Sequence, residues 1–340
     1  MKFPKTPNSL KLTQFMNSPK LVAGYHASHE QFKPSELLTW AQKANAAGFN
    51  HSLCSDHYYP WSETQGESGF AWSWLGAAMQ ATNMEFGIVN APVQRYNPAI
   101  IAQAVATLCE MFPGKFWIAT GSGQFLNEHI NGEKWPSKEI RNERLKECVD
   151  IMRALWRGEM VSHKGHVVVE EAKLYTRPDY MPTVIGAAIT TKTARWIGGW
   201  ADGMITTSKP YDELKATIDA FREGGGEGKP VYVKVQLSYD RTYEKALQGA
   251  HEQWRNNVFS SSLLSDIKMP EAFDAAGVMI QPEEILPFVR VSDSTDQHIE
   301  WLSRDYEAGA SHVYLHNVNR EQDQFIDVFA EKVLPALDRL

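Results

Sequence analysis

Short apolar runs alternate with longer segments of helical spacing along most of the chain. The apolar runs have the length of buried strands, and they begin near Leu21, His51, Phe86, Lys115, Thr183, Ala201, Val231 and His312. Amphipathic segments lie between most of these runs, and those from Pro34 and from Arg141 each end at a glycine. Eight strands that alternate with helices predict parallel pairing through right-handed crossovers, and therefore an α/β fold of the (β/α)8 TIM-barrel type.

Two stretches interrupt this alternation. Residues 158–182 contain a hairpin-like pattern, and residues 258–291 are irregular, which predicts two insertions, the second of them a candidate lid. Residues 1–18 form a polar arm, so we expect a single barrel domain over 19–340. An open doubly wound sheet would carry a glycine-rich dinucleotide turn after its first strand, but here that turn reads HASHEQF from His26.

The composition narrows the possible classes of protein. With 340 residues, of which 43% are hydrophobic, the chain can fill a large core. A net charge of -7 without any basic run argues against nucleic acid or an acidic membrane surface as a partner. Three widely spaced cysteines predict no structural zinc site and favour the reducing cytoplasm, and we expect neither a membrane span nor a signal peptide.

Polar and small residues recur where successive strands end. In a barrel these ends meet at one rim, which is where barrel enzymes carry their active sites. Asp56 and His57 follow the second strand. A histidine beside a carboxylate can move a proton near neutral pH, although the same dipeptide also forms a simple capped turn.

Two glycine-containing turns extend this pattern. Residues 121–123 (Gly-Ser-Gly) would let backbone amides approach a planar or anionic ligand, or would form an ordinary tight turn. Residues 186–188 (Gly-Ala-Ala) lead to Thr190 and Thr191 at the start of a helix. That arrangement suits a phosphate group and equally suits ordinary threonine capping.

Five segments, in the same order along the chain, resemble the bacterial luciferase-like superfamily: GYHASHEQF, SDHYYPW, QRYNPAIIAQAVATL, GSGQFLNEHI and GGWADGMITT. The resemblance extends over most of residues 20–340 and is nearest to the branch of deazaflavin-dependent glucose-6-phosphate dehydrogenases and their flavin-using relatives. It implies a (β/α)8 barrel that binds FMN or the deazaflavin coenzyme F420 at the strand C-termini, usually as a homodimer.

The resemblance also assigns roles to individual residues. His57 matches the active-site histidine, Glu30 an active-site carboxylate, and Trp61 a tryptophan beside the substrate. Cofactor contacts are expected, by the same resemblance, at Asp56, Val89, Asn90, Ala91, Ser122, Gly123, Asn127, Ala187, Ala188 and Thr191. The family pattern further implies a cis peptide bond between Val89 and Asn90.

The sequence departs from the sugar-phosphate dehydrogenases at two places. Gln124 replaces a proton-transferring glutamate, and an amide cannot exchange a proton at neutral pH. The basic residues that hold a sugar phosphate are also missing, since Lys209 is one position out of line and Leu263 and Phe288 stand near the other two positions. We therefore expect a small, weakly charged organic substrate rather than glucose 6-phosphate.

These observations lead to one main hypothesis and several alternatives. The main hypothesis is an FMN-dependent oxidoreductase, acting by hydride transfer or with oxygen as a monooxygenase, with His57, Glu30 and Gln124 as catalytic candidates and without a metal. The lack of a basic run for a polyglutamate tail favours FMN over the deazaflavin. The alternatives are an F420-dependent dehydrogenase, a flavin-binding protein without activity, and a metal-dependent hydrolase whose ligands would come from His26, His29, His57 and His316.

Overall fold

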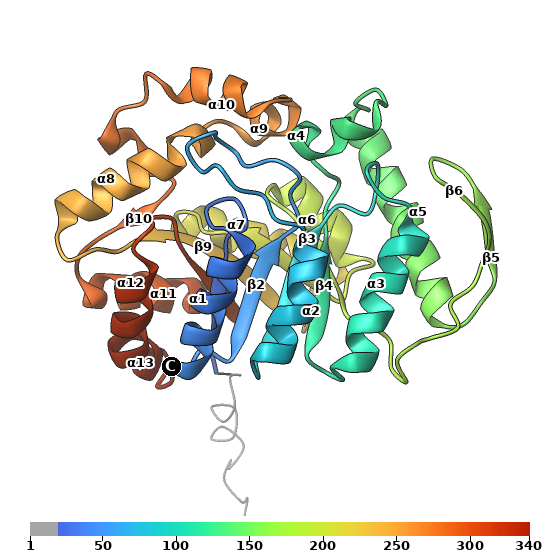
Figure 1. The fold of residues 1–340 in the computed structure, drawn as a ribbon, viewed down its shortest axis with the longest axis horizontal. Helices are drawn as coiled ribbons and strands as arrows, with labels where there is room; N and C mark the ends of the chain where they lie inside the picture. Colours follow the sequence, from blue (N-terminus) through green and yellow to red (C-terminus); the bar gives the residue numbers. More distant parts are fainter. Residues whose placement is uncertain (1–19) are drawn as a thin grey trace, which may run out of the picture.

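Eight parallel strands close into a barrel. The computed structural model describes residues 20–340, and its strands are β1 (Val22–Ala27), β2 (His51–Ser55), β3 (Glu85–Asn90), β4 (Phe116–Thr120), β7 (Val184–Ala187), β8 (Gly203–Thr207), β9 (Val231–Ser238) and β11 (His312–Asn317) (Figure 1). Their order is β9-β11-β1-β2-β3-β4-β7-β8, and β8 pairs back with β9. The predicted (β/α)8 fold is confirmed.

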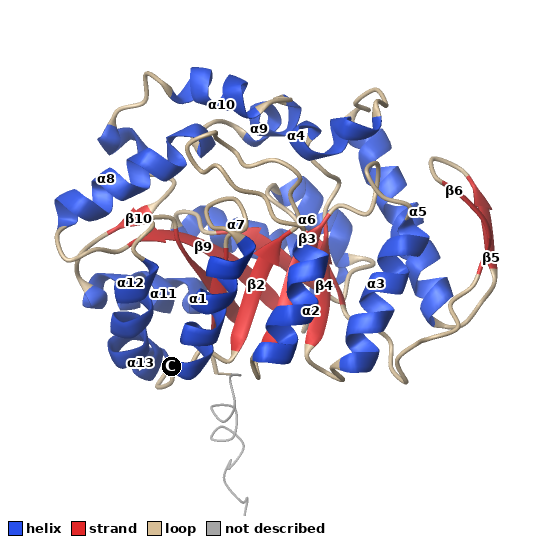
Figure 2. Ribbon diagram, in the orientation of Figure 1, coloured by secondary structure: helices blue, strands red, loops and turns tan. Residues whose placement is uncertain are grey.

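Helices cover the outside of the barrel (Figure 2). They are α1 (Pro34–Ala46), α2 (Ala71–Ala81), α3 (Pro98–Met111), α5 (Lys138–Trp156), α6 (Thr191–Gly198), α7 (Tyr211–Phe221), α8 (Tyr243–Trp254), α11 (Thr295–Ala308), α12 (Gln322–Val328) and α13 (Leu334–Leu337). In α5, Leu145, Val149 and Met152 are spaced three and four residues apart and are buried, so one apolar face turns toward the core.

Aromatic side chains fill the half of the barrel interior that lies nearer the N-terminal ends of the strands. The Trp117 ring lies 4.7 Å from the Tyr232 ring and 5.8 Å from the Tyr314 ring, measured between centroids. A Cβ atom on Gly87 would lie 2.1 Å from the Trp117 ring, so this position requires glycine. These contacts leave the interior packed, as in other barrels of this size.

Further elements are attached to the barrel. Strands β5 (Val161–Lys164) and β6 (Val168–Ala172) form an antiparallel hairpin that projects beside α5 in Figure 1. Within 258–291 the chain forms α9 (Ser261–Asp266), α10 (Pro270–Gly277) and a short strand β10 (Arg290–Val291) parallel to β9, so much of this stretch is regular rather than irregular. A short helix α4 (Phe125–Glu128) follows β4, and α4, α9 and α10 lie above the same end of the barrel.

The hydrophobic pattern does not predict α11. Its N-terminus is capped by Ser294, whose hydroxyl accepts a hydrogen bond from the Gln297 amide, and it stops at Gly309 with φ of 112°. Its inner face includes the polar side chains of His298 and Asp305, and Asp305 accepts two hydrogen bonds from Arg290. Because part of the buried face is polar, hydrophobic periodicity misses this helix.

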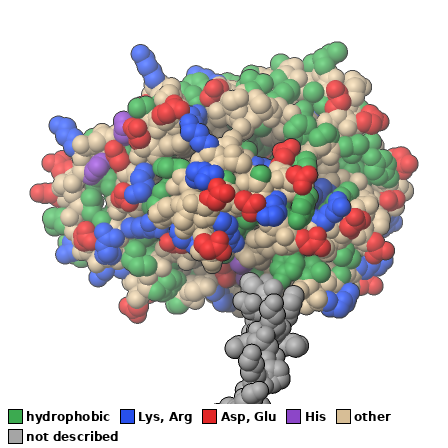
Figure 3. Space-filling view, turned by 180° about the vertical axis from the view of Figure 1, so that it is seen from behind, with side chains coloured by type: hydrophobic (Ala, Val, Ile, Leu, Met, Phe, Trp, Pro, Cys, Tyr) green, Lys and Arg blue, Asp and Glu red, His purple; other side chains and the backbone are tan. Residues whose placement is uncertain are grey.

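The predicted arm over residues 1–18 lies outside the described residues. Within residues 20–340 none of the helices combines the length and the apolar character that crossing a membrane requires. On the face seen in Figure 3, acidic and basic side chains are interspersed over the surface.

Candidate active site

A cavity of about 1870 Å³ opens at the C-terminal ends of the strands. Its lining includes the last residues of β2, β3, β7 and β8, namely Ser55, Asn90, Ala187 and Thr207. Pockets for one small ligand are usually about 300–1,000 Å³, so this cavity has room for a coenzyme together with a substrate. Most of the predicted site residues line it: Asp56, His57, Trp61, Val89, Asn90, Ala91, Ser122, Gly123, Gln124, Asn127 and Ala187.

His57 lines the cavity and forms an acid–base pair with Glu30, which is buried and does not itself line the cavity. His57 Nδ1 lies 2.6 Å from Glu30 Oε1, and Ser28 donates a hydrogen bond to Glu30 Oε2 at 2.9 Å. Burial alone would raise the pKa of Glu30, but the charge and hydrogen bond of His57, aided by Lys234, hold it well below its usual range. With Nδ1 facing Glu30, the Nε2 atom of His57 is the nitrogen that can exchange a proton with a bound molecule.

Asp56 bonds to other side chains and not to His57, although the two residues are adjacent in the sequence. Three side chains donate hydrogen bonds to its Oδ2 atom, at 3.2, 2.8 and 2.8 Å: Trp72, Asn90 and Tyr96. The guanidinium of Arg95 lies 3.3 Å from the same oxygen. The Oδ1 atom of Asp56 is buried and has no partner, so it is the atom available to a donor on a ligand.

The predicted cis peptide bond is absent. No peptide bond within residues 20–340 is cis, and Val89 and Asn90 continue β3 as ordinary strand residues. Parallel pairing with β4 reaches Asn90, which lies opposite Thr120, and this pairing keeps the segment regular. The Oδ1 atom of Asn90 is also buried without a partner beside the cavity.

The turn after β4 brings Gly123, Gln124 and Asn127 to the rim. Gly123 has φ of 79°, and a Cβ there would lie 2.9 Å from Glu128, so the turn requires glycine. Asn127 Oδ1 accepts a hydrogen bond from the Tyr58 amide at 2.8 Å. Asn127 therefore fixes the chain just after His57, and Gln124 remains a lining residue with a neutral amide.

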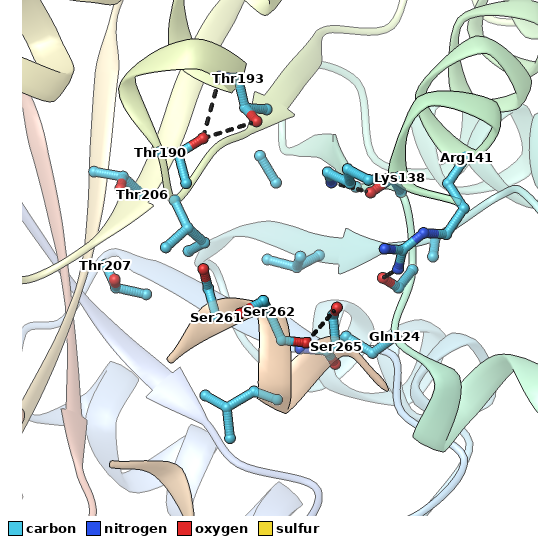
Figure 4. A pocket seen from close by; sticks show the side chains of 18 of the residues that line it. Gln124, Lys138, Arg141, Thr190, Thr193, Thr206, Thr207, Ser261, Ser262 and Ser265 are labelled. Carbon is cyan, nitrogen blue, oxygen red and sulfur yellow. Dashed lines mark hydrogen bonds between the residues drawn. The ribbon is translucent and has the colours of Figure 1, made fainter. Parts of the chain in front are cut away.

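The turn after β7 differs by one residue from the prediction. Ala188 is buried, and its amide bonds to the Ile205 carbonyl at 2.9 Å, while Thr191 is exposed, so neither lines the cavity. Thr190 is the cap of α6, and its hydroxyl accepts from the Thr193 amide. Because three residues make nearly one helical turn, Thr190 and Thr193 share the face toward the cavity and Thr191 does not (Figure 4).

A pair of cations that the sequence analysis missed lies on the opposite side of the pocket from Thr206 and Thr207 (Figure 4). The Lys138 ammonium bonds to the Ser122 hydroxyl, and burial together with Arg141 lowers the pKa of Lys138 to about 8. The Arg141 guanidinium lies 4.2 Å from the centroid of the Trp135 ring. Among the described residues neither cation has a carboxylate partner within ion-pair distance. They occur within one turn of α5, so no basic run marks them.

Two further residues missed by sequence reasoning lie on the other side of the cavity. The Lys234 side chain points into the cavity from β9, and Trp254 of α8 lies beside it, with 5.5 Å between the ammonium and the ring centroid. The available signal was a lysine within an apolar strand, VYVKVQLS, because buried strands rarely carry an ammonium. Trp61 lines the cavity as expected, and its ring contacts that of His57 edge to face at 5.4 Å.

The residues present fit a flavin-type ring. Buried polar atoms without partners, Asp56 Oδ1 and Asn90 Oδ1, lie beside small side chains such as Ala91 and Ala187 that leave room for a planar group. Lys138 and Arg141 offer positive charge to an anionic tail. Within residues 20–340 no three His, Cys, Asp or Glu side chains are grouped so that they could hold a metal ion.

Fold and site together define an oxidoreductase of the luciferase-like type. The sequence pattern of the luciferase-like monooxygenase family matches residues 14–312, and the chain belongs to this family.

Relatives show which members of the family are similar. The F420-dependent glucose-6-phosphate dehydrogenase of Beutenbergia cavernae is 32% identical over 328 residues, which cover 93% of this chain and 97% of that protein. A solved F420-dependent secondary alcohol dehydrogenase, in complex with an F420-acetone adduct, is also 32% identical, with a TM-score of 0.87 and coverage of 94% and 99%. The FMN-bound oxygenating constituent of 3,6-diketocamphane monooxygenase from Pseudomonas putida is 16% identical, with a TM-score of 0.68 and coverage of 93% and 98%, and it supports the fold alone.

Proposed function

We propose that this protein is an F420-dependent dehydrogenase that interconverts a secondary alcohol and a ketone on a small organic substrate. The observation that carries the proposal is His57, paired with the buried Glu30, with its Nε2 atom available to the cavity next to Trp61. The names of the relatives at 32% identity support the deazaflavin rather than the expected FMN. A homodimer remains part of the proposal, from the family resemblance.

Several residues would hold the coenzyme. Asp56 and Asn90 would bind polar edges of the ring through their unpartnered oxygens, and the small side chains of Val89 and Ala91 would border it. Lys138 and Arg141 would bind the anionic tail. When bound, the coenzyme supplies a ring carbon that accepts or returns a hydride.

The protein's own residues would handle the proton. His57 Nε2 takes the proton of the substrate hydroxyl while the carbon–hydrogen bond breaks and the carbon–oxygen double bond forms. The imidazolium that results lies against Glu30, whose negative charge stabilises it. In the reverse direction the same nitrogen returns the proton to the alkoxide oxygen. Gln124 can donate a hydrogen bond to the substrate but cannot replace His57 in proton transfer.

Titration of the purified protein with F420 and with FMN tests the proposal. We expect F420 to bind at micromolar concentration, seen as a change in its fluorescence, and FMN to bind more weakly. Secondary alcohols should then bleach the bound coenzyme, and the ketone should restore its colour. Tight binding of FMN with no binding of F420 would overturn the proposal, as would bound F420 that no alcohol or ketone can reduce or reoxidise.

A further inference from the structure

Lys234 is an ammonium without a protein partner inside the cavity. It lies on β9, opposite Thr207 of β8 and Tyr314 of β11. Its side chain lines the cavity next to Trp254, and among residues 20–340 its Nζ atom makes neither a hydrogen bond nor an ion pair. The Lys234 side chain is only partly exposed, so a ligand that displaces water from the cavity must supply an acceptor for this ammonium.

Glu30, the carboxylate whose charge acts on Lys234, already has hydrogen-bond partners. Both oxygens of Glu30 have partners, Oε1 with His57 and Oε2 with Ser28. Burial, with Lys234 as a further cause, lowers the pKa values of His26 and His316 well below the usual range, so these two side chains are neutral near pH 7. Burial lowers the pKa of Lys234 and the charge of Glu30 raises it, but no oxygen of Glu30 contacts the Lys234 ammonium, which has no direct hydrogen-bond partner among residues 20–340.

Neutral hydrogen-bond donors lie beside this ammonium. Gln236 is two residues further along β9 and so points to the same side of the strand, and both residues line the cavity. The Ser208 hydroxyl donates to Gln236 Oε1 at 2.9 Å, which leaves the Gln236 amide nitrogen for another acceptor. The Thr206 hydroxyl is buried without a partner and lines the same cavity. One cation with neutral donors nearby suits a carboxylate, which accepts hydrogen bonds on both oxygens.

A phosphate fits the surroundings of Lys234 less well than a carboxylate does. A phosphate dianion is usually held by several cations, whereas the neighbouring lysine, Lys209, donates to the Ile189 carbonyl and to the Thr217 hydroxyl. Leu263 and Phe288 are apolar and exposed, and they add no charge. Lys234 is the ammonium that lies beside Gln236, and its one positive charge matches a single negative charge.

We propose that Lys234 binds a carboxylate of the substrate, and that the natural substrates are hydroxy or oxo carboxylic acids. This inference rests on the proposed function for its chemistry. In the barrel β9 lies opposite β3, so Lys234 faces the cavity from the side across from Asn90. Trp61 and Trp254 would then flank the hydrocarbon part of the acid, and His57 would meet its hydroxyl group.

Matched substrate pairs test the inference. The probes are 2-hydroxybutanoate, 3-hydroxybutanoate and 4-hydroxypentanoate, each beside its carboxamide, which has nearly the same shape without the charge. Binding to the coenzyme-free protein is measured by calorimetry, and kcat/KM is measured by F420 reduction. We expect the wild type to prefer the acid, and Lys234→Met to reduce the acid-to-amide ratio by about 10- to 100-fold, with Lys234→Arg retaining most of it.

Lys209→Met is the matched control, because it removes a cavity lysine whose ammonium already has protein partners. It should change binding of both members of a pair by the same factor. A wild type that binds the amide as well as the acid, or an unchanged ratio in Lys234→Met, would overturn the inference. If thermal unfolding shows that Lys234→Met is not folded, Lys234→Gln takes its place.

The two proposals fail in different ways. Acid binding without any F420 reduction would contradict the proposed function alone. F420 reduction by neutral alcohols without acid preference would contradict this inference alone.

Discussion

The two ends of β2 carry the same pair of residue types in different surroundings. At the N-terminal end, His51 Nδ1 lies 3.7 Å from Glu85 Oε2, and at the C-terminal end His57 Nδ1 lies 2.6 Å from Glu30 Oε1. The side chain of Glu85 is 32% exposed, whereas that of Glu30 is 4% exposed. Water screens the electrostatic attraction between His51 and Glu85, whereas burial strengthens the attraction between His57 and Glu30.

The interior of the barrel differs in the same way. Near the N-terminal end the space is filled by Trp117, Tyr232 and Tyr314, and no lining residue of the cavity comes from the first residues of β2 or β3. Near the C-terminal end the cavity takes the place of packed rings. A histidine–carboxylate pair therefore becomes a candidate for catalysis only where it is dehydrated and also faces space for a substrate.

Substitution of the two histidines tests this contrast most strongly. His57→Ala should lower kcat/KM for F420 reduction by about 10²- to 10⁴-fold, because the proton acceptor is lost. His51→Ala removes the histidine at the other end of β2 and should leave kcat/KM within about threefold. Steady-state kinetics with one secondary alcohol compares the variants, and equal losses in both would refute the distinction between the two ends.

Removal of a tryptophan should affect the two ends in opposite ways. Trp117→Ala leaves a void in the packed interior, and we expect the free energy of unfolding to fall by about 3–5 kcal/mol. Trp61 borders the cavity, so Trp61→Ala should cost less stability and should instead raise KM for the substrate. Denaturant unfolding and kinetics on both variants measure this. A larger loss of stability in Trp61→Ala would show that the mouth, not the closed end, is the packed region.

The pH dependence of coenzyme affinity gives the smallest expected effect. Burial and Arg141 lower the pKa of Lys138 to about 8, so its positive charge is present at pH 7 and is largely lost by about pH 9. Affinity for the anionic coenzyme should therefore fall by about 10-fold over this range. Fluorescence titration of F420 at several pH values gives the profile, and Lys138→Met should bind weakly with no decrease between these values. A wild-type profile as flat as that of the variant would exclude Lys138 from coenzyme binding.

The order of strands and helices could be predicted from the sequence, because burial of one face leaves a local hydrophobic period. Helix α11 is the exception, and its buried His298 and Asp305 explain why. The strand ends also marked Asp56, His57 and Gly123 as rim residues, since parallel strands bring their ends to one side. The implied cis bond at Val89 and Asn90 was wrong.

The local pattern of the chain is enough to predict the barrel and the strand ends from which its site is built. Which side chains meet there was decided by closure of the barrel: Glu30, rather than the adjacent Asp56, reaches His57. Closure also brings Lys138 and Lys234 to one cavity from segments far apart in the chain, without any basic run. Periodicity records only whether each residue is buried, and contacts between distant segments depend on the curvature and pairing of the whole sheet.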